Sequence, residues 1–155
     1  RLIPDIIRAW VDKKTLQIRN PLHTRPWQHV LEPIYGYLKS SESLIKNSLL
    51  SGAYNIGPKH NESKCVGDIV QLAKSILEIT NETLITAENQ TQHKESTYLS
   101  LDPSKIKEGM NVEGVLDVEK ALQMTLEWYK YYYDGKDATE LILNDITIYE
   151  NTLYL

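Results

Sequence analysis

The 155-residue sequence contains one cysteine, Cys65, and no phenylalanine. A single cysteine excludes an internal disulfide and any metal site built from several cysteines. It is typical of a protein from a reducing compartment, so we expect a cytoplasmic location. The composition is otherwise that of a globular domain, with 41% hydrophobic and 25% charged residues.

Blocks of positive charge and long apolar runs are also missing. The 17 Lys and Arg and 21 Asp and Glu residues are interspersed and leave a net charge of −4, which argues against a nucleic-acid partner. No apolar run approaches the roughly 20 residues that cross a bilayer, and the first residues do not form a signal peptide. The chain begins at Arg1 rather than at methionine, so we expect it to start within a longer protein.

Complete catalytic motifs are absent. The sequence contains no GxGxxG or Walker loop, no HExxH and no CxxC. Its four histidines do not have the spacing of metal ligands, and Cys65 is more ordinarily a small buried residue than a nucleophile. We therefore predict no catalytic residue and no metal site in this chain.

Hydrophobic periodicity predicts mostly helices. The expected helices cover residues 2–11, 26–39 with a kink at Pro33, 66–77, a segment beginning after Asp102, 118–133 with Asp117 as its cap, and 138–149. Short strands are expected at residues 16–19, 51–58 and 99–101, and a polar loop at 81–95. So few strands cannot form a stable sheet alone. The fold class is therefore α/β, seen as a mainly helical portion of a larger protein with a parallel sheet.

The segment between the first predicted strand and the second predicted helix, residues 19–33, is the most informative. It holds two Arg, two His, one Trp and three Pro, and open α/β folds bind ligands at such strand ends. Arg25, just ahead of the expected helix start, could bind a phosphate, or it could pair with Glu32 or cap a nearby carbonyl. Core packing is the favoured role for Trp27, and turn formation is the ordinary role for Asn55.

Residues 25–33 read Arg-Pro-Trp-Gln-His-Val-Leu-Glu-Pro, and this run resembles the signature of the CDP-glucose 4,6-dehydratases. Residues 1–10, 18–21, 55–58, 99–105 and 127–130 are similar to the family in the same order. The family belongs to the extended short-chain dehydrogenase/reductases, in which an N-terminal Rossmann domain binds NAD. The resemblance implies that residues 1–155 are the C-terminal nucleotide-sugar-binding domain of a homo-oligomeric enzyme that converts CDP-glucose to CDP-4-keto-6-deoxyglucose.

The resemblance also implies which residues bind substrate. These are Arg1 and Leu2 along the nucleotide, Gln17 and Arg19 near the base and ribose, Arg25 at the phosphates, Asn55 at the nucleotide portion, and Glu95 on the far side. The catalytic Tyr-x-x-x-Lys pair of the family lies upstream of this chain, and Tyr35 with Lys39 matches that spacing by chance. The Leu-Gly-Trp that usually follows the equivalent of Ser104-Lys105 is not present here.

Two other interpretations stay open at this point. One is an epimerase or reductase that acts on another nucleotide sugar, because those enzymes share the architecture. The other is a binding or assembly module without catalysis. The run at residues 25–33 argues against the first, and the start without methionine argues against the second.

Overall fold

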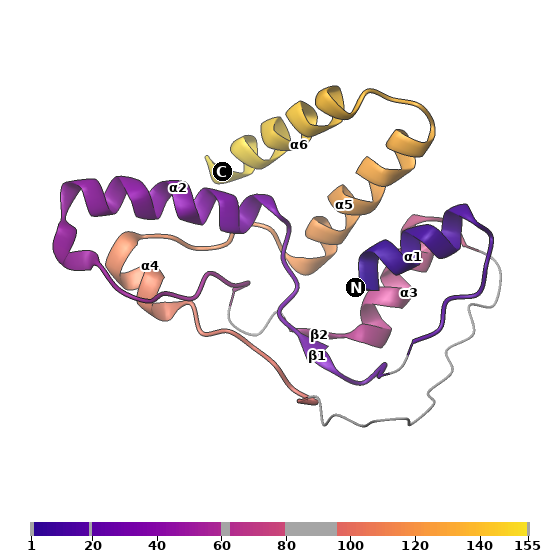
Figure 1. Cartoon of the computed structure of the whole chain (residues 1–155), viewed down its shortest axis with the longest axis horizontal. Helices are drawn as coiled ribbons and strands as arrows, with labels where there is room; N and C mark the ends of the chain where they lie inside the picture. The colour runs from indigo at the N-terminus through magenta and orange to yellow at the C-terminus, as the bar shows by residue number, and fades with distance from the viewer. Residues whose placement is uncertain (1, 19, 60–62, 80–95, 155) are drawn as a thin grey trace.

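The computed structural model describes residues 2–18, 20–59, 63–79 and 96–154. Figure 1 shows a mainly helical molecule with one small sheet. Its elements, in chain order, are α1 (Leu2–Val11), β1 (Thr24–Arg25), α2 (Leu31–Lys46), the 3₁₀ turn η1 (Ser48–Leu50), β2 (Lys64–Cys65), α3 (Val66–Ile76), α4 (Ser104–Met110), α5 (Val118–Tyr133) and α6 (Ala138–Leu153).

The main hydrophobic core lies among α1, α3 and α5. Each of these helices buries one apolar stripe with helical spacing, and Ile7, Ile69 and Leu126 are among the largest fully buried side chains. Leu16 and Ile18 complete this core from the segment that follows α1. The predicted bounds of α1 and α5 are confirmed, and α3 begins at the predicted residue, Val66.

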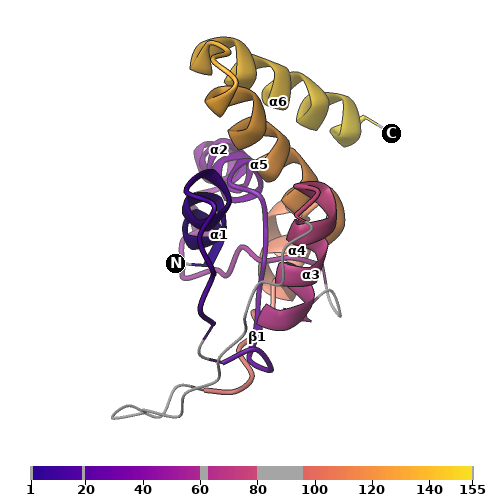
Figure 2. The ribbon, with the colours of Figure 1, turned by 90° about the vertical axis from the view of Figure 1, so that its right-hand side faces the viewer.

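Two smaller clusters extend from α5 and α4. Tyr149 on α6 packs with Met124 on α5 and, edge to face, with Tyr35 on α2. Ile106 on α4 packs with Ile56. Figures 1 and 2 show α5 running from its position beside α3 to α6, so α5 connects the main core to the α2–α6 cluster.

The predicted strands are wrong. Leu16 and Ile18 are buried and Gln17 between them is exposed, as in a strand, but no described segment pairs with them. Residues 51–58 and 99–101 are also irregular in the part of the chain that is described. Alternation predicts which side chains are buried, whereas a strand also needs a neighbouring backbone to complete its hydrogen bonds.

The strands that form lie elsewhere. β1 and β2 are antiparallel, with Thr24 opposite Cys65 and Arg25 opposite Lys64, and Thr24 also forms a parallel bridge to Tyr98. The polar loop expected at 81–95 lies outside the described residues.

The predicted position of the second helix is also wrong. α2 begins at Leu31 rather than at Pro26 and continues to Lys46. Pro33 therefore lies in the first turn, where its missing N–H costs no helical hydrogen bond, and it produces no kink. α4 begins at Ser104, one residue later than predicted, so Pro103 rather than Asp102 is its N-cap. Asp102 Oδ1 still accepts a hydrogen bond from the N–H of Ser104 at 2.9 Å.

Among the described residues, the helices are all too short or too polar to cross a membrane.

Candidate functional site

The polar side chains of residues 25–33 reach several different parts of the molecule, and almost every one of them has its own partner. It begins in β1, crosses the middle of the molecule and enters the first turn of α2 (Figure 1). Because it has little regular structure, its side chains supply many of the hydrogen bonds that hold it in place.

Arg25 lies in β1, not at a helix start as expected. Its Nη1 donates to the carbonyl oxygens of Thr24 at 2.8 Å and Ser96 at 3.0 Å, and its Nη2 lies 3.3 Å from His23 Nδ1. The alternative that Arg25 caps nearby carbonyls is therefore confirmed for the chain by itself. The alternative that it pairs with Glu32 is wrong, because Glu32 has other partners.

Trp27 and Gln28 connect the segment to the two neighbouring loops. The Trp27 ring packs against the main core, and its Nε1 donates to the carbonyl of Lys64 in β2 at 2.9 Å. This confirms core packing as the role of Trp27. Gln28 Nε2 donates to the carbonyl of Ile56 at 3.3 Å, while its Oε1 is buried and receives no hydrogen bond from the described residues.

Glu32 is a buried carboxylate, 5% exposed, at the start of α2. Its Oε1 accepts hydrogen bonds from the N–H groups of Val115 at 2.9 Å and Leu116 at 2.7 Å. Its Oε2 accepts one from the Tyr149 hydroxyl at 3.0 Å, and burial, with Glu32 beside it, raises the pKa of Tyr149. Gly114 passes so close that an added Cβ would lie 3.3 Å from Oε2. One side chain thus joins α2, the loop before α5, and α6.

His29 is equally buried and faces Asp145 of α6. Its Nδ1 accepts a hydrogen bond from the Leu31 N–H at 3.3 Å, which leaves the neutral ring with its proton on Nε2. Nε2 lies 4.0 Å from Asp145 Oδ2, and burial lowers the pKa of His29. Burial, together with repulsion from Glu127, raises the pKa of Asp145 to about 6. In both groups burial therefore disfavours the charged form.

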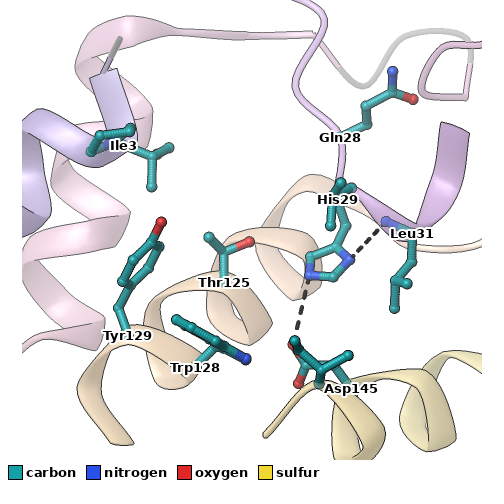
Figure 3. A pocket seen from close by; sticks show the side chains of 11 residues that line it. Ile3, Gln28, His29, Leu31, Thr125, Trp128, Tyr129 and Asp145 are labelled. Carbon is teal, nitrogen blue, oxygen red and sulfur yellow. Dashed lines mark hydrogen bonds and ion pairs between the residues drawn. The ribbon is translucent and has the colours of Figure 1, made fainter. Parts of the chain in front are cut away.

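A cavity of about 470 Å³ opens beside this pair. Figure 3 shows His29 and Asp145 pointing toward each other, with Thr125, Trp128 and Tyr129 of α5 beside them and Ile3 of α1 opposite. Sequence reasoning did not find this cavity. Asp145 carries no motif, and only the packing of α6 against α5 brings it to His29.

The other residues implied to bind substrate lie on separate segments. Leu2 packs against the main core at the start of α1, and Gln17 is exposed between two buried neighbours. Asn55 is exposed and donates through Nδ2 to the carbonyl of Asp102 at 3.4 Å. Arg1, Arg19 and Glu95 lie outside the described residues.

The remaining candidates have structural roles. Lys39 bonds to Glu42 on the surface of α2, while Tyr35 packs on Tyr149. Cys65 is the N-cap of α3, and its Sγ accepts a hydrogen bond from the Asp68 N–H at 3.4 Å. Within the described ranges, no three His, Cys, Asp or Glu side chains are grouped as a metal site would need.

Comparison with known proteins gives one similar curated sequence. No protein-family model matches the chain. CDP-glucose 4,6-dehydratase from Salmonella typhimurium is 32% identical over 150 residues, which cover 96% of this chain and 41% of the relative. The chain therefore spans less than half the length of that protein, and the resemblance noted from residues 25–33 is confirmed over almost the whole chain.

Solved structures show the same fold. dTDP-glucose 4,6-dehydratase from Bacillus anthracis, in complex with NAD, aligns with a TM-score of 0.69 at 20% identity over 87% of this chain and 40% of its own. UDP-glucuronic acid 4-epimerase from Bacillus cereus, in complex with UDP-glucuronic acid and NAD, aligns at 0.72 and 18% identity over 86% and 40%. The fold is thus that of the C-terminal portion of short-chain dehydrogenase/reductase enzymes acting on nucleotide sugars, and the sequence is similar to that portion of CDP-glucose 4,6-dehydratase.

Proposed function

We propose that this chain is the nucleotide-sugar-binding portion, residues 1–155, of an NAD-dependent CDP-glucose 4,6-dehydratase. The observation that carries the proposal is the similarity to the Salmonella enzyme over 96% of the chain. The run at residues 25–33 supports it, because its side chains bond to β2, to the loop before α5 and to α6 and so hold them in one arrangement. A binding surface assembled from several segments needs this kind of fixed support.

The reaction would convert CDP-glucose to CDP-4-keto-6-deoxyglucose. NAD, held by an N-terminal Rossmann half, would accept a hydride from the sugar and return it. The residues of this chain would bind and orient the nucleotide and contribute no catalytic group. The whole enzyme would be a cytoplasmic homo-oligomer that needs neither a nucleic acid nor a membrane.

Arg25 is the residue proposed to contact the phosphates. A guanidinium is a planar fork of N–H donors that matches the oxygens of a phosphate. Leu2, Gln17 and Asn55 would lie along the nucleotide. Arg1, Arg19 and Glu95, which are outside the described residues, complete the proposed set.

One face of α2 is proposed to meet the Rossmann half. We call it the α2 stripe, and it consists of four exposed apolar side chains with helical spacing: Val30, Ile34, Leu38 and Ile45. Large exposed apolar side chains on one face of a helix are typical of an interface.

The experiment is a product assay on the longer protein that contains this chain, supplied with CDP-glucose and NAD. We expect a product that has lost one water and carries a keto group, detected by mass spectrometry. A product with the same mass as CDP-glucose would instead show that the enzyme is an epimerase. CDP-glucose binding without any product would favour a module without catalysis.

A further inference from the structure

The cavity beside His29 has the size and lining of a small-molecule site. Its volume of about 470 Å³ lies within the range of roughly 300–1,000 Å³ that such sites occupy. Apolar and aromatic side chains form most of its wall: Ile3, Pro4, Val30, Leu31, Trp128, Tyr129 and Ile142. Polar groups are few, and two of them, His29 and Asp145, lie together, which is a pattern that orients one ligand.

The polar end of the cavity carries an acid without a close partner. The side chain of Asp145 is 16% exposed, and among the described residues its one oppositely charged or donor neighbour is His29, whose Nε2 lies 4.0 Å from Oδ2. This distance is too long for a hydrogen bond. A partly buried carboxylate without a cation or donor is costly, and a ligand that supplies one recovers that cost.

The charged and titratable groups around Asp145 come from two neighbouring elements. His29, ahead of α2, is held neutral by burial, and Glu127 of α5 is negative and repels the Asp145 carboxylate. Neither group compensates a negative charge on Asp145. The field in this end of the cavity therefore favours a cation over an anion.

We propose that the cavity between α1, α5 and α6 binds a small organic amine, with its ammonium group on the Asp145 carboxylate and its apolar body against Trp128 and Tyr129. Aromatic faces attract cations as well as apolar groups, so both ends of such a ligand are accommodated. The site uses none of the residues implied to bind the nucleotide sugar, and of the α2 stripe it shares only Val30. Its test is therefore separate from the test of the proposed dehydratase activity.

The test uses two probes with the same indole ring, tryptamine and indole-3-propionate. Calorimetric titration of the 155-residue chain at pH 7.5 should give a Kd for tryptamine on the order of 1 mM. Indole-3-propionate should bind at least about tenfold more weakly, because its carboxylate faces Asp145. Tryptamine affinity should fall as the pH is lowered through about 6, where Asp145 becomes protonated.

Two variants and one control complete the experiment. Asp145→Asn should weaken tryptamine binding about tenfold or more, and Ile142→Trp, at the half-exposed rim, should abolish it by filling the cavity. Asp134→Asn removes the same charge after α5, outside the lining, and should leave the Kd unchanged. Equal affinity for the two probes, unchanged affinity in Asp145→Asn, or no tryptamine binding up to about 10 mM would each overturn the proposal.

Discussion

At the scale of single residues, the polar side chains at residues 25–33 act mainly by completing hydrogen bonds of distant backbone. Arg25 reaches Ser96 and Glu32 reaches Leu116. Such bonds matter to the stability of the fold, because removing one partner leaves a buried polar group unsatisfied. The free energy lost is then the full desolvation penalty of that group. Substitutions here should therefore affect stability and function together.

Replacing Arg25 separates its two roles. Arg25→Ala removes two bonds to carbonyl oxygens and should lower the unfolding free energy by about 1–2 kcal/mol. In the longer enzyme it should also weaken CDP-glucose binding about ten- to a hundredfold while NAD binding is unchanged. Arg25→Lys should restore only part of that affinity, since an ammonium does not reproduce the guanidinium fork. Calorimetric titration measures the affinities of each variant for CDP and for NAD. An unchanged CDP affinity would show that Arg25 is not part of the substrate site.

Replacing Glu32 should be more damaging. Glu32→Ala leaves the buried N–H of Leu116 and the Tyr149 hydroxyl without an acceptor, so we expect a loss of about 3 kcal/mol or more. Tyr149→Phe deletes one donor from the same group and should cost about 1–2 kcal/mol. Urea unfolding measures both values. Similar small losses in the two variants would show that the carboxylate does not organise this junction.

The Asp145 carboxyl makes stability depend on pH. Because its pKa is raised to about 6 in the folded chain and is about 4 when unfolded, the folded state binds the proton more tightly. Its contribution to stability is therefore greatest below about pH 4 and is lost as the pH rises to about 6.

Asp145→Asn removes this ionisation, so the variant should be more stable than the parent at pH 7.5 by about 1–3 kcal/mol. The difference should shrink toward pH 4. Thermal melts at both pH values measure it, with Asp134→Asn as the control of equal charge. A constant difference between Asp145→Asn and the parent at the two pH values would contradict the argument.

At the scale of elements, α2 differs most from the other helices. Its N-terminal turn is fixed by Glu32 and by Tyr35 against Tyr149, but the α2 stripe faces solvent, and Leu38 and Ile45 are 66% and 87% exposed. Gly36 on its other side lies against Ile56, where an added Cβ would approach Cδ1 to 2.8 Å. The helix therefore has one close-packed face and one without a described partner.

The exposed stripe should make the isolated chain associate. Leu38→Lys with Ile45→Lys should reduce that association without lowering the melting temperature, because neither side chain is buried. Sedimentation velocity at several concentrations measures the change. Leu143→Lys, an exposed apolar position on α6 outside the stripe, is the matched control. A parent chain that remains monomeric at high concentration would contradict this prediction.

At the scale of the whole molecule, the chain corresponds to 41% of the length of its curated relative and contains no motif for binding NAD. We therefore expect the pure 155-residue chain to form no keto product from CDP-glucose, even with NAD added. Product formation by this chain alone would overturn the assignment of catalysis to the other half. The longer protein under identical conditions is the positive control.

The sequence by itself determined the helices that carry strong periodic stripes and clear ends. α1, α3 and α5 begin at the predicted residues because local signals, such as the Asp117 side chain that accepts from the Lys120 N–H, operate within one turn. The alternating burial of Leu16 and Ile18 and the core packing of Trp27 could also be predicted, since apolar surface is buried whatever the backbone does.

Only the tertiary structure decided the strands, the start of α2 and the partners of the polar side chains. Residues 16–18 alternate like a strand but have no described backbone to pair with. Arg25 lies in a strand because the backbone of Lys64 lies opposite it. The partner of Glu32 is 84 residues away at Leu116, and the cavity exists because α6 places Asp145 opposite His29. Local spacing contains no information on such contacts, because chain segments far apart in sequence meet only when the whole core forms.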